Sequence, residues 1–442
     1  MNIICTDRWY SQYPPGHCFL LLLGLLAGAP WLVNPLLGSA SLVVLFLLAR
    51  SCYPDARVAT LSVVFFLFSP FFLFMAASHM NHTSAMFFML LFFLGVVRTF
   101  ERPGWASAVM AGAALGCALN IRPATAAVMG LPWCVYLLVR TLRRPRAFAP
   151  RLIGFMLGAG VLLAVLLTYN YQTNGHPLQF GYNVKYNVSG FLGSAHLGPP
   201  HTLRGGLKNT SNNLTALNRY LFEWPFPSLA FVFALLLPGM QRNRWDLLFM
   251  LSVLLLAVFY FFYYYQDLCF GPRFFFSPAP LLVLLTVRCL LQLPGRMARL
   301  GYDRRAVRAV VCLFVCCCFG YTLAVSMPRL YAKYSDFYWH VDNALYKAVT
   351  AAGIANAVVF VDVMVPPETD VPNLPVYGAG FLHNEPDLRG PVVYAVDRGQ
   401  RNPELMRAYP DRSYYLWKYE PGPQRFRLVP LPGPTSAVSA PR

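Results

Sequence analysis

The chain has 442 residues, of which 57% are hydrophobic and 12% are charged, and its mean hydropathy is +0.47. This composition excludes an ordinary soluble protein and indicates a polytopic membrane protein with some soluble mass attached. The formal net charge of +18 is concentrated before residue 327, beside the apolar runs, so it is a membrane-orientation signal and does not predict a nucleic-acid partner.

The first apolar run, 17–28, follows a polar and aromatic stretch that lacks the pattern of a secretory signal. It is short and ends in Gly-Ala-Pro, so we expect an interfacial or re-entrant helix there instead of a span. Ten further runs are long enough, or nearly so, to cross a membrane as helices. They lie at 33–49, 57–77, 84–99, 105–119, 124–140, 151–169, 228–238, 246–264, 275–292 and 308–326.

The connections between these runs alternate in their arginine content. Those on one side carry most of the arginines, whereas the short connections on the other side carry only Arg122 and Arg273. Because positively charged connections stay in the cytoplasm, the arginine-poor side faces outward. Both ends of the sequence, the long 170–227 loop and the turn at 78–83 are then predicted on the outer side.

The C-terminal part, 327–442, has a different pattern. The stretches NAVVFVDVMV and GPVVYAVDRG predict buried strands, HVDNALYKAVTAAG and NPELMRAYPDR predict helices, and the final LPGPTSAVSAPR predicts a disordered end. The predicted fold is an α-helical polytopic membrane protein with about ten spans plus one interfacial helix (1–326). A small C-terminal α/β extracytoplasmic domain (327–442) follows it.

No metal or redox site is predicted from the cysteines and histidines. The eleven cysteines all precede residue 319 and show no C-x-x-C spacing, so they are interpreted as small apolar residues. His79 and His82 would need a third ligand to bind a metal, and none is evident nearby.

Ionisable residues at membrane depth are costly, so the few on the outer side are candidates for function. The outward acids of the membrane region are Asp7, Glu223 and Asp267. Asp267 and Arg273 flank the stretch LCFGP, where a span begins. The functional interpretation is an arginine that grips a phosphate, beside a carboxylate that orients or deprotonates a substrate. The alternative is an interfacial ion pair with a snorkelling arginine.

The other outer connections also have two interpretations. His79, Asn81 and His82 in SHMNHT would hydrogen-bond a hydroxylated substrate or form a plain polar turn, and on a helical turn the two histidines would share a face. Arg122 in NIRPA would bind an anion or snorkel. The aromatic run FYFFYYYQ, which includes Tyr265, would be an interfacial belt or the lining for a lipid or sugar.

Several stretches, in this order on this topology, carry a family resemblance. They are RWYSQYPPGH, PWLVNPLLG with LFLLAR, LFSPFFLFMAASHMNHTSA, ALNIRPATA and FGPRFFFSPAPLLVLL. Over about residues 8–330 the chain resembles the bacterial polytopic glycosyltransferases of the GT-C superfamily, such as the protein O-mannosyltransferase and aminoarabinose-transferase relatives. The C-terminal part is similar to the small extracytoplasmic domain that some members carry.

The resemblance implies an enzyme of the bacterial inner membrane that moves a sugar from a polyprenyl-phosphate donor to a lipid, glycan or protein acceptor at the outer face. The implied partners are this donor, an envelope acceptor and membrane lipids; no cofactor is predicted, although a divalent metal is compatible. In the family, the GPRF arginine meets the lipid phosphate and the SHMNH turn stands near the acceptor. The expected catalytic residues are Asp7, Asp267, His79 and His82, and the expected substrate-binding residues are Asn81, Arg122, Tyr265 and Arg273.

One departure concerns the first outer loop. The family's catalytic aspartate follows a first transmembrane helix, whereas Asp7 is the only acid before YPPG here. We therefore expect either an N-terminally incomplete sequence or a variant without the usual base. Both cases argue against activity more than against the fold, and an enzyme that is inactive because it is N-terminally incomplete stays an open alternative. The alternative function is a non-catalytic glycolipid-binding or envelope-assembly protein on the same scaffold. A transporter is disfavoured, because paired broken spans and mid-membrane ionisable residues are not evident.

Overall fold

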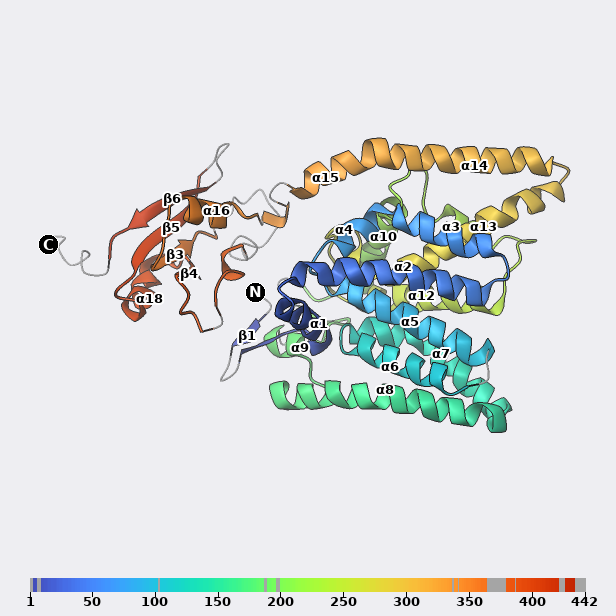
Figure 1. Ribbon diagram of the computed structural model, residues 1–442, viewed down its shortest axis with the longest axis horizontal. Coiled ribbons are helices and arrows are strands. Elements are labelled where there is room, and N and C mark those ends of the chain that lie inside the picture. The colour runs from blue at the N-terminus through green and yellow to red at the C-terminus, as the bar shows by residue number, and fades with distance from the viewer. Residues whose placement is uncertain are drawn as a thin grey trace. The chain divides into compact units, whose positions relative to one another are not determined.

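The computed structural model describes residues 3–5, 9–101, 104–186, 189–195, 199–335, 338–340, 342–363, 379–385, 387–420 and 426–433. The chain divides into two compact units, Asn2–Met327 and Pro328–Arg442. The first is helical apart from a short hairpin, and the second contains a four-stranded sheet (Figure 1).

The first unit begins with an antiparallel hairpin, β1 (Ile3–Cys5) and β2 (Trp9–Ser11). Its helices are α1 (Pro15–Leu26), α2 (Val33–Cys52), α3 (Ala56–Leu67), α4 (Pro70–Ala76), α5 (His82–Glu101), α6 (Ala106–Leu119), α7 (Pro123–Arg143), α8 (Pro145–Asn174), α9 (Gly181–Tyr186), α10 (Leu203–Tyr220), α11 (Ala230–Ala234), α12 (Arg244–Phe262), α13 (Ala279–Ala298) and α14 (Arg304–Tyr321). A π-helix, η3 (Thr322–Ser326), joins α14 to α15 (Met327–Ser335). The predicted helical class is confirmed.

Seven helices of the described chain are long and apolar enough to cross a membrane, and the bent pair α3–α4 would make an eighth. The run 228–238 forms only the five-residue α11, which is about 8 Å long at 1.5 Å per residue. It therefore does not form a spanning helix of its own. The helix α6, with 14 residues, is also shorter than a typical span. The count of about ten spans stays a prediction.

The predicted interfacial run forms α1, which has 12 residues and is too short to cross a hydrocarbon core of about 30 Å. Pro15 occupies its first position, where the missing N–H is not needed. Gly28, with φ of +70°, allows the sharp turn into the 3₁₀-helix η1 (Pro30–Leu32). The exposed side chains of α1 are apolar: Phe19, Leu22, Leu23, Leu25 and Leu26. Such a short apolar helix suits an interfacial position.

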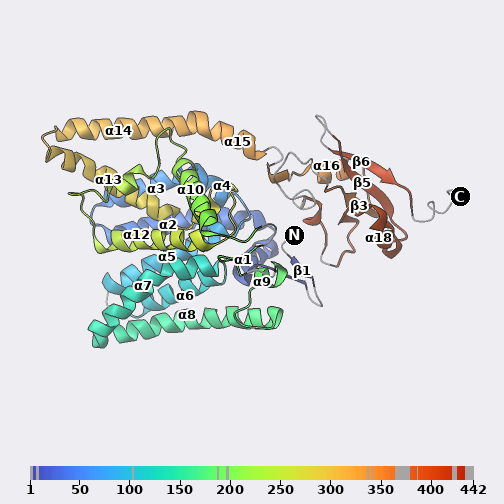
Figure 2. The same ribbon diagram turned by 180° about the vertical axis from the view of Figure 1, so that it is seen from behind.

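Small residues bring α5, α6 and α8 into close contact, and α6 lies between the other two in both views (Figures 1 and 2). A Cβ on Gly112 of α6 would overlap the backbone carbonyl of Phe155 on α8. A Cβ on Gly158 of α8 would overlap the carbonyl of Val109 on α6. Glycine is therefore required on both sides of this interface, as in other membrane helix pairs.

A buried aromatic contact fixes α7 against α12. The rings of Trp133 and Trp245 stack with their centroids 5.8 Å apart, and Trp133 Nε1 donates to Ser252 Oγ at 2.9 Å. Since Trp133 is fully buried, the indole N–H needs this acceptor. The contact sets the relative position of the N-terminus of α7 and the C-terminus of α12, where polar residues gather.

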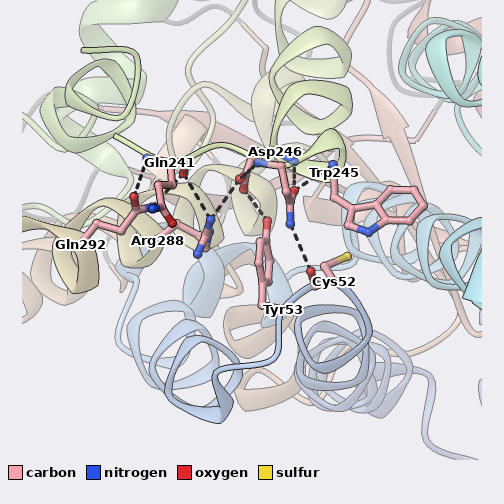
Figure 3. Close-up of polar contacts among 8 residues, drawn as sticks. Cys52, Tyr53, Gln241, Trp245, Asp246, Arg288 and Gln292 are labelled. Carbon is pink, nitrogen blue, oxygen red and sulfur yellow. Dashed lines mark hydrogen bonds and ion pairs between the residues drawn. The ribbon is translucent and has the colours of Figure 1, made fainter. Parts of the chain in front are cut away.

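A second polar cluster lies at the opposite end of α12 (Figure 3). Tyr53 donates to Asp246 Oδ1 at 2.6 Å, and Arg288 of α13 pairs with Asp246 Oδ2 at 3.3 Å. Asn243 forms a capping box with Asp246 and donates to the Cys52 carbonyl at 3.2 Å. These contacts join the α2–α3 connection to the start of α12 and to α13. The buried Asp246 carboxylate, which would be costly in isolation, thus has a partner on each oxygen.

The second unit contains β3 (Ala357–Val361), β4 (Val392–Val396), β5 (Ser413–Tyr419) and β6 (Phe426–Leu431) in the order β4-β3-β5-β6. The strand β3 is parallel to β4 and β5, and β6 is antiparallel to β5. The small C-terminal α/β domain is confirmed, and the predicted disordered end falls outside the described residues.

Two helices of this sheet unit, α16 and α18, cover opposite faces of the sheet. Leu345 and Val349 of α16 (Ala344–Ala351) pack with Val359 of β3. Met406 of α18 (Asn402–Ala408) packs with Phe360, the next residue along the same strand. Successive side chains of a strand point to opposite faces, and burial of both faces explains why β3 reads as a continuous apolar run.

Candidate functional site

The turn between α4 and α5 is held by hydrogen bonds to its backbone carbonyls. Asn34 Nδ2 donates to the carbonyls of Ser78 and Met80, the latter at 2.7 Å. His17 Nε2 donates to the carbonyl of His79 at 2.9 Å, since a carbonyl can only accept. The conformation of this turn is therefore set by α2 and α1, and not by the turn alone.

His17 makes a further contact through its other ring nitrogen. Its Nδ1 lies 2.9 Å from Ser84 Oγ, and Ser84 also donates to the Asn81 carbonyl at 3.0 Å. The preceding Gly16 donates its N–H to the carbonyl of Asn120 at 2.8 Å. The N-terminus of α1 thus contacts the SHMNH turn and the NIRP turn together.

Arg122 reaches four neutral partners from the start of α7. Its Nη1 lies 3.1 Å from His82 Nε2 and 3.4 Å from Asn81 Oδ1. Its Nη2 lies 3.3 Å from the Tyr260 hydroxyl, and Nε donates to Thr125 at 3.4 Å. None of the ion pairs found among the described residues includes Arg122. This half-buried cation thus has hydrogen-bond partners but no counter-charge in that part of the chain.

The contact with Arg122 fixes the tautomer of His82. A guanidinium can only donate, so Nε2 of His82 accepts and Nδ1 carries the hydrogen. The ring is 2% exposed, whereas the side chain of His79 is exposed. The expectation that the two histidines share a helical face is wrong, because α5 begins only at His82 and His79 lies in the turn before it.

Arg273 has a carboxylate partner. Its Nε and Nη2 donate to the two oxygens of Asp267 in a bidentate pair, and the Tyr265 hydroxyl donates to Asp267 Oδ2 at 3.1 Å. Burial alone would lower the pKa of the Arg273 guanidinium, but the Asp267 carboxylate outweighs burial and the pKa lies above its ordinary value. The remaining Nη1 lies 3.9 Å from the sulfur of Met80.

The backbone before Arg273 is held in an unusual conformation. Phe270 has φ of +57° and Gly271 has φ of +123°, and a non-glycine residue in the left-handed region costs about 1 kcal/mol or more. A Cβ on Gly271 would lie 3.0 Å from the Phe71 ring and 3.2 Å from the Tyr220 ring. This tight connection ends in a short 3₁₀-helix, η2 (Arg273–Phe275), which places Arg273 at its start.

Phe274 brings the two arginines together. The guanidinium carbon of Arg122 lies 5.3 Å from its ring centroid and that of Arg273 lies 5.6 Å from it, both within cation–π range. The two side chains also approach the same turn, at Met80 and at Asn81–His82. Two positive charges from distant parts of the sequence therefore converge on one ring and one turn.

The structure connects six of the predicted site residues in one network: Asn81, His82, Arg122, Tyr265, Asp267 and Arg273. His79 contributes its carbonyl, and Asp7 falls outside the described residues. Sequence reasoning did not single out His17, Asn34, Thr125, Tyr260 or Phe274. All five lie in stretches that were quoted for the family resemblance or as the aromatic run. Their composition did not mark them individually, because they act through contacts between segments.

In the part of the chain that the structure describes, no three or more His, Cys, Asp or Glu side chains are grouped as metal ligands. The charged donors at the site are instead two guanidinium groups, which can only donate, and the Tyr265 hydroxyl donates as well. Such a donor set fits an anion better than a cation.

Two family models match the chain. Residues 18–169 match the family described as dolichyl-phosphate-mannose-protein mannosyltransferase, and residues 358–428 match a domain of unknown function (DUF7846). No curated protein matches the chain.

The fold is similar to that of ArnT from Cupriavidus metallidurans. The structure of ArnT bound to undecaprenyl phosphate aligns with a TM-score of 0.58 at 14% identity, covering 98% of this chain and 89% of that one. ArnT in the apo state aligns with a TM-score of 0.57, the same identity and the same coverage.

These likenesses define the class: the chain is a multi-pass membrane protein with an ArnT-like fold. The segment 18–169, which matches the mannosyltransferase family, contains the SHMNH and NIRP turns. The resemblance inferred from the sequence motifs is confirmed.

Proposed function

We propose that the protein is a membrane glycosyltransferase that takes its sugar from a polyprenyl-phosphate donor. The observation that carries this proposal is the convergence of Arg122 and Arg273 on Phe274, with Arg122 bonded only to neutral groups in the described chain. A partly buried guanidinium without a counter-charge is costly, so the site is suited to receive an anion. The family segment and the ArnT-like fold support a lipid phosphate as that anion.

The chemistry requires charge stabilisation at the phosphate. The acceptor oxygen forms a bond to C1 of the sugar while the bond from C1 to the phosphate oxygen breaks. The lipid phosphate changes from a singly charged diester to a more highly charged monoester, so Arg122 and Arg273 stabilise the developing charge more than the ground state. The acceptor proton passes to a carboxylate, for which Asp7 and Asp267 are the candidates.

The remaining predicted residues have distinct roles in this proposal. His82 positions Arg122. The lone pair on its Nε2 accepts a hydrogen bond from that guanidinium, so it is not available as a base. Asn81 and the exposed His79 contact hydroxyl groups of the sugar or the acceptor. Tyr265 and the aromatic run around it contact the lipid or the sugar, and Tyr265 also holds Asp267.

We place this site at the outer face of a bacterial inner membrane, with the domain 327–442 on the same side. Arginine asymmetry between the connections supports this orientation. The two polar clusters at the two ends of α12 support a membrane-spanning position for this helix. This helix has 19 residues and is about 28 Å long, which is close to the hydrocarbon thickness.

The test compares single variants of the full chain in detergent. Arg122→Ala and Arg273→Ala are each expected to lower sugar transfer from a polyprenyl-phosphate donor by about 100-fold or more, and to weaken binding of undecaprenyl phosphate. The matched control is Arg57→Ala, since Arg57 forms an exposed pair with Asp55 away from the site and should leave both measurements unchanged. A folded wild-type protein that binds no lipid phosphate would contradict the proposal.

A non-catalytic glycolipid-binding protein is the second candidate. It is favoured by one observation: the Asp267 carboxylate, a candidate base, is engaged by Arg273. This function predicts arginine-dependent binding of the lipid phosphate without any sugar transfer, so the same two measurements separate the candidates.

A further inference from the structure

Asp267 occupies the part of Arg273 that a phosphate would use. The bidentate pair joins Nε and Nη2 of the guanidinium to the two carboxylate oxygens. Phosphate groups are bound by the same pair of parallel N–H donors. A phosphate cannot take this edge of Arg273 while the carboxylate remains on it.

The bonds that hold the Asp267 carboxylate come from its own connection. No helix or strand is formed between Tyr263 and Pro272, the connection from α12 to η2. In the described chain, the Asp267 side chain is bonded by Arg273 and by the Tyr265 hydroxyl, and both belong to this connection or its end. If the carboxylate leaves Arg273, these hydrogen bonds break, and none of them joins two of the long helices.

The two arginines differ in what they require before an anion binds. Arg122 has neutral partners, so no counter-charge has to leave it when an anion binds. Arg273, with its side chain 21% exposed, is neutralised by Asp267, which is 8% exposed. An empty site with two unpaired guanidinium groups would be strongly unfavourable, because both charges are desolvated and they repel each other.

We propose that Asp267 is the resting counter-ion of Arg273 and that the donor phosphate displaces it from the Nε–Nη2 edge on binding. This inference rests on the proposed function, because it assumes that Arg122 and Arg273 hold a lipid phosphate. The exchange replaces one anion by another, so only an anionic lipid can complete it. A neutral polyprenol cannot, and the site thereby selects the phosphorylated lipid.

The test measures equilibrium binding of undecaprenyl phosphate to the full-length protein in detergent, with undecaprenol as the neutral probe. Asp267→Asn removes the competing charge, so binding of the phosphate is expected to tighten by about tenfold, while binding of undecaprenol stays unchanged. Tyr265→Phe removes the hydroxyl that holds Asp267 and should tighten phosphate binding by a smaller factor. Asp55→Asn, at a distant exposed pair, is the matched control and should leave binding unchanged.

The outcomes separate this inference from the proposed function. Weaker or unchanged phosphate binding by a folded Asp267→Asn protein would overturn the inference and make Asp267 a positioning residue for Arg273. If Asp267→Asn does not fold, Tyr265→Phe decides, and unchanged or weaker binding would again overturn the inference. A wild-type protein that binds neither lipid would overturn the proposed anion site itself.

Discussion

His17 links the N-terminus of α1 to the turn that carries Asn81 and His82. It is buried, and its two ring nitrogens contact the carbonyl of His79 and the hydroxyl of Ser84. Burial lowers the pKa of His17 below its ordinary value of 6.5. The ring is therefore neutral at pH 7 in the folded state.

This shift predicts a pH dependence of stability. When the pH falls below 6.5, His17 binds a proton in the unfolded chain before it does so in the folded protein. The unfolded state is then favoured, and stability decreases as the pH is lowered from 6.5 towards the folded pKa. The Tm of the wild type in detergent is expected to fall more between pH 7.5 and pH 5.5 than that of His17→Gln, which cannot titrate. Equal decreases in the two proteins would show that His17 does not contribute.

Some residues of the site were predictable from the sequence because charged residues are rare in the outer connections. Arg122, Asp267 and Arg273 are among the few charges of the outer connections, and the structure places them in one network. The partners that hold them were not predictable, since Tyr260 and Phe274 lie in aromatic runs where every position has the same composition. Only the fold decides which ring faces an arginine.

At the scale of elements, the α6–α8 interface depends on the absence of side chains. Gly112→Ala would place a methyl group against the Phe155 carbonyl, so the two helices would have to separate. We expect a loss of stability of about 1–3 kcal/mol, as for other overpacked sites, measured as a lower Tm in detergent.

Gly160 supplies the matched control on α8, the other helix of this interface. A Cβ at this position would meet nothing within 4 Å, and alanine is the better helix former by about 0.5–1 kcal/mol. Gly160→Ala should therefore leave the Tm unchanged or raise it slightly. A Gly112→Ala protein as stable as Gly160→Ala would mean that this interface is not as close as the structure shows.

The limits of a helix were predictable where residues typical of helix ends, such as Ser-Pro, occur in the sequence. The run 57–77 forms α3 and α4, which are bent by 65°, because Ser69 caps α4 and Pro70 begins it. The Ser-Pro pair was visible in the sequence, but hydropathy alone merged the two helices into one span. The run 228–238 is the opposite case: it is mostly apolar, yet it forms only a short helix, so hydropathy alone did not predict its backbone.

At the scale of the whole membrane unit, the chain between α10 and α12 passes from one polar cluster to the other. Asn213 of α10 donates to Gln266, beside Asp267, at 2.9 Å. Gln241, at the other limit, accepts and donates hydrogen bonds with Gln292 of α13 at 3.0 and 2.7 Å. These partners lie at opposite ends of α12, so the stretch between Asn213 and Gln241 crosses although α11 is too short to span alone.

This crossing is testable, because it decides the sidedness of two exposed positions. Leu178 follows α8 and is 69% exposed, and Leu300 follows α13 and is 56% exposed. If the stretch between α10 and α12 crosses, three passages separate these positions and they lie on opposite sides; without it they share a side.

Single cysteines at positions 178 and 300, in a variant whose native cysteines are replaced, are to be labelled with a membrane-impermeant maleimide on intact spheroplasts. We expect labelling of the cysteine at 178 from outside, and labelling of the cysteine at 300 only after permeabilisation, as arginine asymmetry requires. The cysteine-free parent corrects for background, and retained binding of undecaprenyl phosphate shows that the fold is intact. Labelling of both positions from one side would mean that the stretch between α10 and α12 does not cross the membrane.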